Sequence, residues 1–424
     1  MGIRFRLTLM NFLQFFIWGS WLISIGGYLG GTLHFSGLEI GSVFSTLGIA
    51  SLFMPAVMGI IADKWVNAEK LLGICHLTGA VLLFWASTIT DPHLFFYVML
   101  LNSMFYMPTI ALNSTVSYVV LKQKGYDVVK DFPPIRVWGT VGFIAAMWFV
   151  DLLGWKSSSM QLIFSSASAL VLGIYAFTMP SCKPEKSNQK KTLLARFGLD
   201  ALVLFKQKKM AVFFLFAMFL GAALQITNAF GGSFLESFNL THPGTFGVNH
   251  PIVLLSISQM SETLFILTIP FFLHRFGIKK VMLISMFAWV LRFALFGIGD
   301  PGGGLYLLVL SMIVYGMAFD FFNISGSLFV ETEADPRIRA SAQGLFMIMT
   351  NGFGAFFGGI ASGWVVDHFT NGALRDWHSI WFVFAAYALI LGIIFPFVFR
   401  YKHEGRVIKE VQAEAVSSEI EFLP

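Results

Sequence analysis

The chain has 424 residues, of which 56% are hydrophobic and only 12% are charged. A soluble domain carries about 25% charged residues, so this composition excludes a water-soluble globular protein and indicates many membrane spans. The net charge of +5 does not indicate a nucleic-acid partner, because the basic residues lie in short loops, where they orient insertion. Cys75 and Cys182 provide neither a disulfide framework nor metal-ligand spacing, so we expect no cofactor.

Hydrophobic runs long enough to cross a bilayer recur along the whole chain, and a charged segment divides them into two groups of six. The expected spans are residues 7–33, 38–63, 69–89, 93–120, 134–153, 160–180, 210–236, 250–273, 279–299, 304–330, 338–366 and 377–400. We expect an N-terminal half, a cytoplasmic linker with an amphipathic piece, a C-terminal half and a cytoplasmic tail at residues 1–180, 181–209, 210–400 and 401–424. The sequence therefore predicts an all-α membrane protein of twelve transmembrane helices in two pseudo-symmetric halves.

Lysine and arginine residues predict the orientation in the membrane. With the N-terminus inside, the inner segments hold all but four of the 28 Lys and Arg residues. Lys156 and Arg375 lie in outer segments, and Arg136 and Arg292 fall within spans. This asymmetry follows the positive-inside rule, so we expect both termini in the cytoplasm.

A basic turn occurs at the same place in each half. The second and third spans are joined by a turn that contains Asp63 and Lys64, and the eighth and ninth by one that contains Arg275 and Gly277. Both turns resemble the G-x-x-x-D-[RK]-x-G-[RK] signature of the major facilitator superfamily, although the first lacks the later glycine and the second has histidine in place of the aspartate. The alternative is that both are ordinary basic loops. The major facilitator fold implies a substrate site near the bilayer midplane, between the two halves.

The eighth span carries a carboxylate near its middle, Glu262, with Gln259 three residues earlier on the same helix face. An ionised side chain at mid-bilayer costs about 2.5–3.5 kcal/mol. A chain that keeps one there is expected to use it. We therefore predict that Glu262 is a proton-titratable group that faces the substrate, with a purely structural role as the alternative.

The tenth span has a second carboxylate beside an aromatic stripe. Tyr315, Phe319 and Asn323 step by four along one helix face, and Asp320 is adjacent to it. Arg292 in the ninth span is a candidate partner for Asp320, in which case the two form a structural charge pair. The alternative is that Asp320 takes part in proton coupling.

The fifth span begins with two prolines, Pro133 and Pro134, which suit the first turn of a helix. Arg136, Thr140 and Phe143 follow at helical spacing and form one stripe. Arginine offers several fixed donors to a ligand or a carboxylate, so Arg136 is a candidate binding residue. The alternative is that its side chain reaches the cytoplasmic interface.

The seventh span places two amides, Gln225 and Asn228, on one face. Amides present a donor and an acceptor together, which matches hydroxyl groups or a nucleobase edge. Hydrogen bonding between helices is the alternative role. The chain has no phosphate-binding loop, no H-E-x-x-H and no G-x-S-x-G, which argues against an ATP-driven pump or a membrane hydrolase.

The strings NFLQFFIWGSWL, DFPPIRVWGTVGF, LQITNAFG, SISQMSETLFILTIPFF and MIVYGMAFDFFNISGS resemble bacterial nucleoside:proton symporters of the major facilitator superfamily. The resemblance covers nearly the whole chain. It implies proton-driven uptake of nucleosides through the inner membrane, with the proton as coupling ion. We expect the mechanism to be alternating access and the monomer to be the functional unit. It also implies a substrate site formed by Arg136, Thr140, Phe143, Gln225, Asn228, Gln259, Glu262, Tyr315 and Phe319, with proton coupling by Glu262 and Asp320.

Two other functions stay open at this stage. One is transport of another small polar substrate, such as a sugar or a drug, on the same fold. The other is a membrane-embedded enzyme or receptor. Neither the base preference, nor the acceptance of xanthosine, nor the proton-carrying carboxylate follows from the sequence.

Overall fold

The computed structural model describes residues 2–183, 199–372 and 374–401. Residues 184–198 of the predicted linker and residues 402–424 of the predicted tail lie outside these residues. The last part of the linker, which holds part of its apolar stretch, is described and includes a 3-10 helix at Leu199–Lys206. The described residues are almost entirely helical, with one short antiparallel hairpin besides.

The first half of the chain contains seven α-helices and one π-helix within its described residues. They are α1 (Ile3–Gly19), α2 (Ile25–Gly27), η1 (Tyr28–Thr32), α3 (Gly37–Lys64), α4 (Ala68–Ala86), α5 (Pro92–Gln123), α6 (Val128–Leu152) and α7 (Met160–Ala176). Polar caps begin several of them. Ser36 and Glu39 form a capping box at α3, and the Asp91 carboxylate accepts a hydrogen bond from the Leu94 N–H at α5.

The second half follows a 3-10 helix, η2 (Leu199–Lys206). Its elements are α9 (Lys208–Ser237), α10 (Phe246–Asn249), α11 (Pro251–Ile298), α12 (Leu305–Glu333), α13 (Arg339–Met347), the π-helix η3 (Ile348–Gly354), α14 (Ala355–His368), β1 (Thr370–Asn371), β2 (Leu374–Arg375) and α15 (Trp377–Val398). The α13, η3 and α14 segments run on from one another and together form the eleventh predicted span.

Each of the twelve predicted spans corresponds to a helical segment. Nine helices in the described ranges are long and apolar enough to cross a membrane. One of them, α11, contains two predicted spans, because Gly277 at φ 73° and ψ 164° interrupts the helix between them. The remaining two spans are α1 and α7, with 17 residues each.

Two local predictions are wrong. The first span is not one continuous helix, because α1 ends at Gly19 and the chain turns before α2 and η1. Pro133 and Pro134 are not in a first turn either. The helix α6 begins at Val128, because the Asp127 carboxylate caps it by accepting hydrogen bonds from the next backbone N–H groups, so both prolines lie inside the helix.

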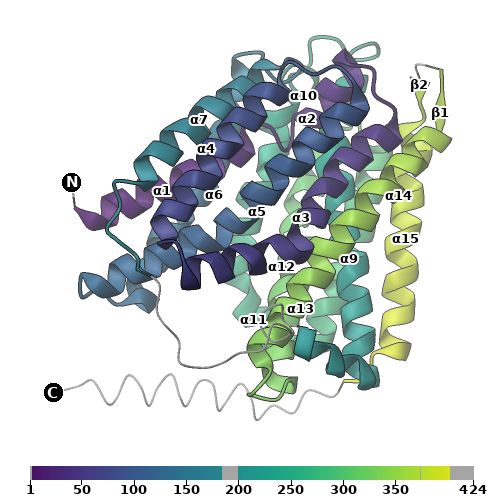
Figure 1. Cartoon of the computed structure of the whole chain (residues 1–424). Helices are drawn as coiled ribbons and strands as arrows, with labels where there is room; N and C mark the ends of the chain where they lie inside the picture. The colour runs from purple at the N-terminus through teal and green to yellow at the C-terminus, as the bar shows by residue number, and fades with distance from the viewer. Residues whose placement is uncertain (1, 184–198, 373, 402–424) are drawn as a thin grey trace.

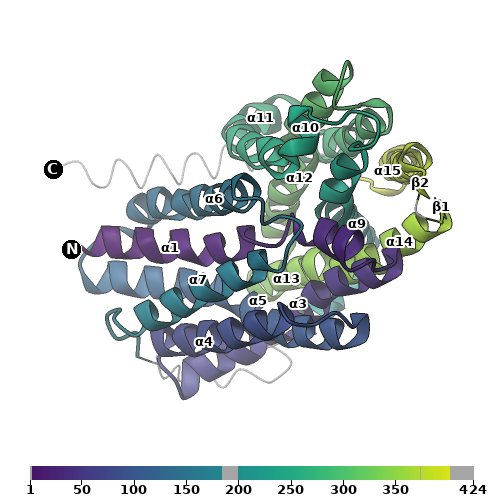
Figure 2. The same cartoon turned by 90° about the horizontal axis from the view of Figure 1, so that it is seen from above.

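The helices form two groups that lie side by side (Figure 2), one built from α1 to α7 and the other from α9 to α15. Contacts between the groups concentrate at the end of the bundle that carries α10 and the β-hairpin, at the top of Figure 1. We call this the joined end. Three helix pairs meet across it: α3 with α14, α6 with α11, and α2 with α9.

Glycines show how closely the groups approach at the joined end. A Cβ atom on Gly41 of α3 would collide with the carbonyl oxygen of Gly359 on α14. Toward the opposite end, a Cβ atom on Gly59 of α3 or Gly344 of α13 would meet no atom within 4 Å. The halves are therefore packed together at one end of the bundle and separate toward the other.

Candidate functional site

Three charged side chains lie together where the two halves face each other. The Glu262 carboxylate on α11 interacts electrostatically with the Arg136 guanidinium on α6, which belongs to the other half. Glu262 also interacts with Asp320 on α12. The structure therefore brings together three of the charged residues that the sequence singled out, and places the cation and the carboxylates in different halves.

Asp320 is the more enclosed carboxylate. Only 3% of the residue is exposed, and its Oδ2 atom has no hydrogen-bond partner in the described part of the protein. Buried polar atoms in native proteins are almost always paired. An unpaired carboxylate oxygen at this position therefore calls for an explanation other than structural stability.

Arg136 does not reach toward the membrane interface. Its guanidinium lies over the ring of Phe15 on α1, with its carbon 4.1 Å from the ring centroid. A cation held over an aromatic face is stabilised by the ring's quadrupole. Further along the same helix, Phe143 is buried and contacts Trp18 edge to face, with ring centroids 6.2 Å apart. Thr140 lies between them and is half-buried.

The aromatic stripe of the tenth span is present on α12. The rings of Tyr315 and Phe319 are stacked with centroids 6.2 Å apart and planes 6° apart. The Trp289 ring of α11 meets the Tyr315 ring edge to face, at an angle of 89°, and the Tyr315 hydroxyl lies close to the Gln259 side chain. These contacts hold the rings of Tyr315 and Phe319 in place beside the carboxylates.

The suggested partnership of Arg292 with Asp320 is wrong. Arg292 is buried, donates a hydrogen bond to the Ser311 carbonyl at 3.0 Å, and lies over the Tyr315 ring at 4.5 Å from its centroid. Ser311 precedes Asp320 by nine residues, which is about 13 Å along a helix. Arg292 therefore belongs to a structural contact between α11 and α12, and its hydrogen-bond partner Ser311 lies about two and a half helical turns from the carboxylate.

The two amides of α9 are placed differently from the charged cluster. Gln225 is buried, and its Oε1 atom has no hydrogen-bond partner among the described residues, while Asn228 is half-buried. Neither amide forms a hydrogen bond with a side chain of another helix within those residues. The alternative of structural bonding between helices is thus not what these side chains do here.

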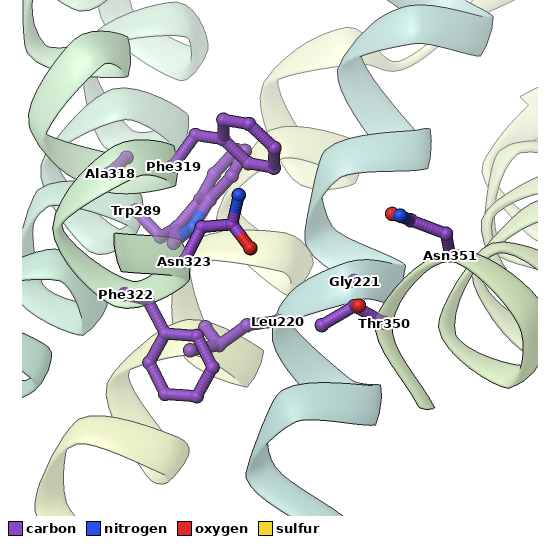
Figure 3. Close-up of a pocket in the computed structure, with 9 residues that line it drawn as sticks. All are labelled: Leu220, Gly221, Trp289, Ala318, Phe319, Phe322, Asn323, Thr350 and Asn351. Atoms are coloured by element: carbon purple, nitrogen blue, oxygen red, sulfur yellow. The ribbon is translucent and has the colours of Figure 1, made fainter. Parts of the chain in front are cut away.

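A small pocket lies between α9, α11, α12 and η3, next to the aromatic stripe (Figure 3). It is lined by Leu220, Gly221, Trp289, Ala318, Phe319, Phe322, Asn323, Thr350 and Asn351. Only Phe319 of these was predicted as a site residue. Asn351 was missed, although an amide in the middle of the eleventh span is a visible signal, and it lies on a π-helix, a conformation frequent at functional sites.

A second buried polar group in the first half was also missed. The Gln14 amide donates to the Thr109 hydroxyl at 2.7 Å, and its carbonyl oxygen is 2.8 Å from the Nε2 atom of His76. The Tyr106 hydroxyl donates to the Gln14 backbone carbonyl at 2.7 Å. These residues come from three helices, so no spacing within one span could have predicted their association.

The described residues include no group of three His, Cys, Asp or Glu side chains placed to hold a metal ion. The chemistry available at the site is hydrogen bonding to a polar ligand, stacking on flat rings and proton exchange on carboxylates.

Relatives of known function agree with this chemistry. The sequence profile of the nucleoside H+ symporter family matches residues 1–404. The chain is 57% identical over 412 residues to the xanthosine permease of Escherichia coli (strain K12), which covers 96% of this chain and 99% of that permease. It is 53% identical over 406 residues to the nucleoside permease NupG of the same organism, with 95% and 97% covered.

Solved structures confirm the predicted fold. A crystal structure of the nucleoside transporter NupG matches with a TM-score of 0.91 at 53% identity, covering 95% of this chain and all of that one. A POT peptide transporter at 15% identity matches with a TM-score of 0.69, which shows a shared fold alone. The predicted major facilitator fold and transporter class are confirmed, and the rival assignment as an enzyme is excluded. The chain belongs to the nucleoside H+ symporter family.

Proposed function

We propose that this protein takes up nucleosides together with protons across the bacterial inner membrane by alternating access, and that it does so as a monomer. The observation that carries the proposal is the interaction of Arg136 in one half with Glu262 in the other, beside the unpaired Asp320. A ligand that enters between the halves must meet this cluster. Family membership supports the substrate class and the coupling ion.

The orientation follows from the distribution of basic residues. The positive-inside rule puts both termini in the cytoplasm, which makes the joined end the outer end. The conformation described here is then closed toward the outside. Transport requires the halves to rock so that the outer end parts and the inner end closes.

Nine side chains form the proposed nucleoside site. Arg136 and the amides bind the ribose hydroxyls and the base edge, and the Tyr315–Phe319 stack provides an aromatic face for the base. The full set is Arg136, Thr140, Phe143, Gln225, Asn228, Gln259, Glu262, Tyr315 and Phe319. The buried Gln225 and the half-buried Asn228 have no side-chain partner on another helix among the described residues, which favours this role, because a bound ligand would satisfy them.

The two carboxylates have different roles in this proposal. Glu262 has a cationic neighbour in Arg136, which favours its ionised form, so we assign Glu262 to holding the substrate. Asp320 has no such neighbour within the described residues and is buried, so the neutral acid is the less costly form there. We assign the travelling proton to Asp320, with Glu262 as its electrostatic neighbour on the path.

The test is uptake of labelled uridine into cells that lack their own nucleoside transporters, with and without a protonophore. Concentrative uptake that collapses with the protonophore is expected. Competition by unlabelled xanthosine, adenosine and a sugar then defines the substrate class. Uptake that merely equilibrates would remove the proton from the mechanism, and competition by the sugar but not by nucleosides would favour the rival substrate.

A further inference from the structure

Two aspartates at the joined end link one half of the molecule to the other. Asp151 lies at the end of α6, and only 2% of the residue is exposed. Its Oδ2 atom accepts hydrogen bonds from the backbone N–H groups of Ile252 at 3.0 Å and Val253 at 2.8 Å. Those N–H groups belong to the first turn of α11, in the opposite half.

The same contact occurs a second time with the halves exchanged. Asp367, at the end of α14 in the second half, accepts hydrogen bonds from the N–H groups of Gly37 at 2.5 Å and Leu38 at 2.8 Å. These begin α3 in the first half. Asp151 in the fifth span thus caps the eighth span, and Asp367 in the eleventh span caps the second. The fifth and eleventh spans occupy the same position in their respective halves, and so do the second and eighth, so the two contacts are related by the pseudo-symmetry of the halves.

Helix physics explains why a carboxylate suits both positions. The first N–H groups of a helix have no partner within it, and the helix dipole is positive at this end. An ionised carboxylate that accepts two such N–H groups makes short, charge-assisted hydrogen bonds. Separation of the halves would leave both the carboxylate and the helix end without these partners.

Each aspartate also has a basic neighbour that contacts the opposite half. The Lys156 ammonium lies 2.8 Å from Asp151 and donates a hydrogen bond to the backbone carbonyl of Asn249 in the second half. Arg375 interacts with Asp367, and a Cβ atom on Gly30 of the first half would lie 3.2 Å from its guanidinium. The basic residues therefore add to the same two links.

We propose that Asp151 and Asp367 form a reciprocal pair of latches that hold the outer end closed, and that both are released together when the protein opens outward. The inference rests on the alternating access proposed above and goes beyond it by naming the groups that set the balance between the two states. Loss of one latch raises the outward-open population, because that state does not contain the contact.

Matched control caps exist at the same end of the molecule. Asp91 accepts a hydrogen bond from the Leu94 N–H at 2.7 Å and Asp376 from the Ser379 N–H at 3.1 Å. Each caps the helix that follows it directly in the chain, so neither cap crosses between the halves. Replacing them removes the same chemistry without touching the latch.

The reporter is Ser45→Cys in the full-length chain. Ser45 is buried, and its backbone lies against Gly359 where α3 meets α14. A membrane-impermeant maleimide, added to the outside of intact cells, reacts with this thiol only when the outer end opens. The chain without the reporter provides the blank for Cys75 and Cys182, which are both buried.

Asp151→Asn and Asp367→Asn are each expected to raise the labelling rate about two- to thirtyfold, the range for losing a favourable charge at a helix end. Asp91→Asn and Asp376→Asn should leave it unchanged. The decisive result is Asp151→Asn, because Asp151 lies at the α6–α11 contact whereas the reporter lies at the α3–α14 contact. Faster labelling at the distant contact requires the halves to move as units.

Asp151→Glu keeps the negative charge and should label as slowly as the parent. Faster labelling of Asp151→Asn alone would then come from loss of the charge that holds the latch, and not from misfolding. Labelling is carried out on intact cells, and rates are compared only for variants that elute as a single species after extraction into detergent. Unchanged labelling in Asp151→Asn, or an equal increase in the control caps, would overturn the proposal. Uridine uptake by the parent is measured in parallel, so that failure of the proposed function is seen separately from failure of the latch.

Discussion

The two halves of the molecule differ in how many of their buried polar atoms are paired. Among the described residues of the first half, only Trp18 Nε1 and Asn113 Oδ1 are buried without a hydrogen-bond partner, whereas more such atoms occur in the second half. In the first half, Gln14, His76, Thr109 and Tyr106 bond to one another or to the backbone. In the second half, buried polar atoms of Gln225, Ser233, Arg292, Asp320 and Ser325 have no partner among the described residues. The two halves repeat the same arrangement of helices, but they differ in the pairing of their buried polar atoms.

This difference teaches how to separate structural from functional polar residues inside a membrane. A polar group that only stabilises helix contacts finds a partner, because an unpaired group in hydrocarbon costs several kcal/mol. A group that must bind a ligand or a proton needs a hydrogen-bond donor or acceptor that is not already used by the protein. We therefore propose that the unpaired carboxylate of Asp320 and the unpaired amide oxygen of Gln225 belong to the transport machinery, and that the hydrogen-bonded network around Gln14 is structural.

The largest expected effect comes from removing the unpaired carboxylate. Asp320→Asn should abolish concentration of nucleoside while exchange of labelled for unlabelled nucleoside continues. One coupled charge is worth about 2.3 kcal/mol per 100 mV, which corresponds to about 50-fold accumulation of nucleoside inside the cell. In the variant, the inside and outside nucleoside concentrations should become equal. Uptake at steady state, with and without a protonophore, measures it.

Glu262→Gln is the matched comparison for Asp320→Asn, because it also removes one carboxylate of the same cluster. It should weaken substrate binding more than it affects the coupling. If Asp320→Asn still concentrates uridine and Glu262→Gln does not, the proton assignment has to be exchanged between the two residues.

A smaller effect is expected where the first half meets the cluster. Arg136→Gln removes the cation that faces Glu262 and should raise KM for uridine at least about tenfold, since hydrogen bonds to charged groups contribute about 1.5–3 kcal/mol. Initial uptake rates over a range of uridine concentrations measure it. Arg136→Lys keeps the charge without the planar donors, so a full rescue by lysine would show that only charge matters.

Stability rather than transport should change in the closed network. Gln14→Met removes two side-chain hydrogen bonds and leaves polar partners unpaired, so the free energy of unfolding should fall by about 1–3 kcal/mol. The purified protein should melt at a lower temperature. The folded fraction should still concentrate nucleoside, and a loss of coupling without a loss of stability would remove the distinction between the halves.

The smallest effect is expected from an exposed pair outside the membrane-spanning helices. Arg337 donates hydrogen bonds to Asp335, which lowers the pKa of that carboxyl to about 2. A lowered pKa stabilises the fold above the unfolded value of about 4, and this contribution is lost as the pH falls through about 2. Because the pair is fully exposed, Asp335→Asn should leave the melting temperature at pH 7 unchanged within error. A clear decrease in the melting temperature would mean that this exposed ion pair stabilises the fold as much as the buried hydrogen-bond network does.

Several features of the site could be predicted from single helices. Glu262 and Asp320 were visible because an ionisable residue in an apolar run is costly, and the Tyr315–Phe319 stack follows from a spacing of four residues. The partner of Arg292 was not predictable, because the identity of the facing helix and its rotation are properties of the packed bundle. Asn351 was visible as a polar residue, but its place at a pocket beside Phe319 was not.

The sequence by itself determined the number of spans, the expected orientation, the family and the helices that carry charge. These depend on hydrophobic length, loop charge and local spacing, which are properties of short segments. Tertiary structure alone decided that Arg136 faces Glu262, that Gln14 joins three helices, and that Asp151 and Asp367 cap helices of the opposite half. Such contacts join residues up to 330 positions apart, and only the packing of one half against the other brings them together.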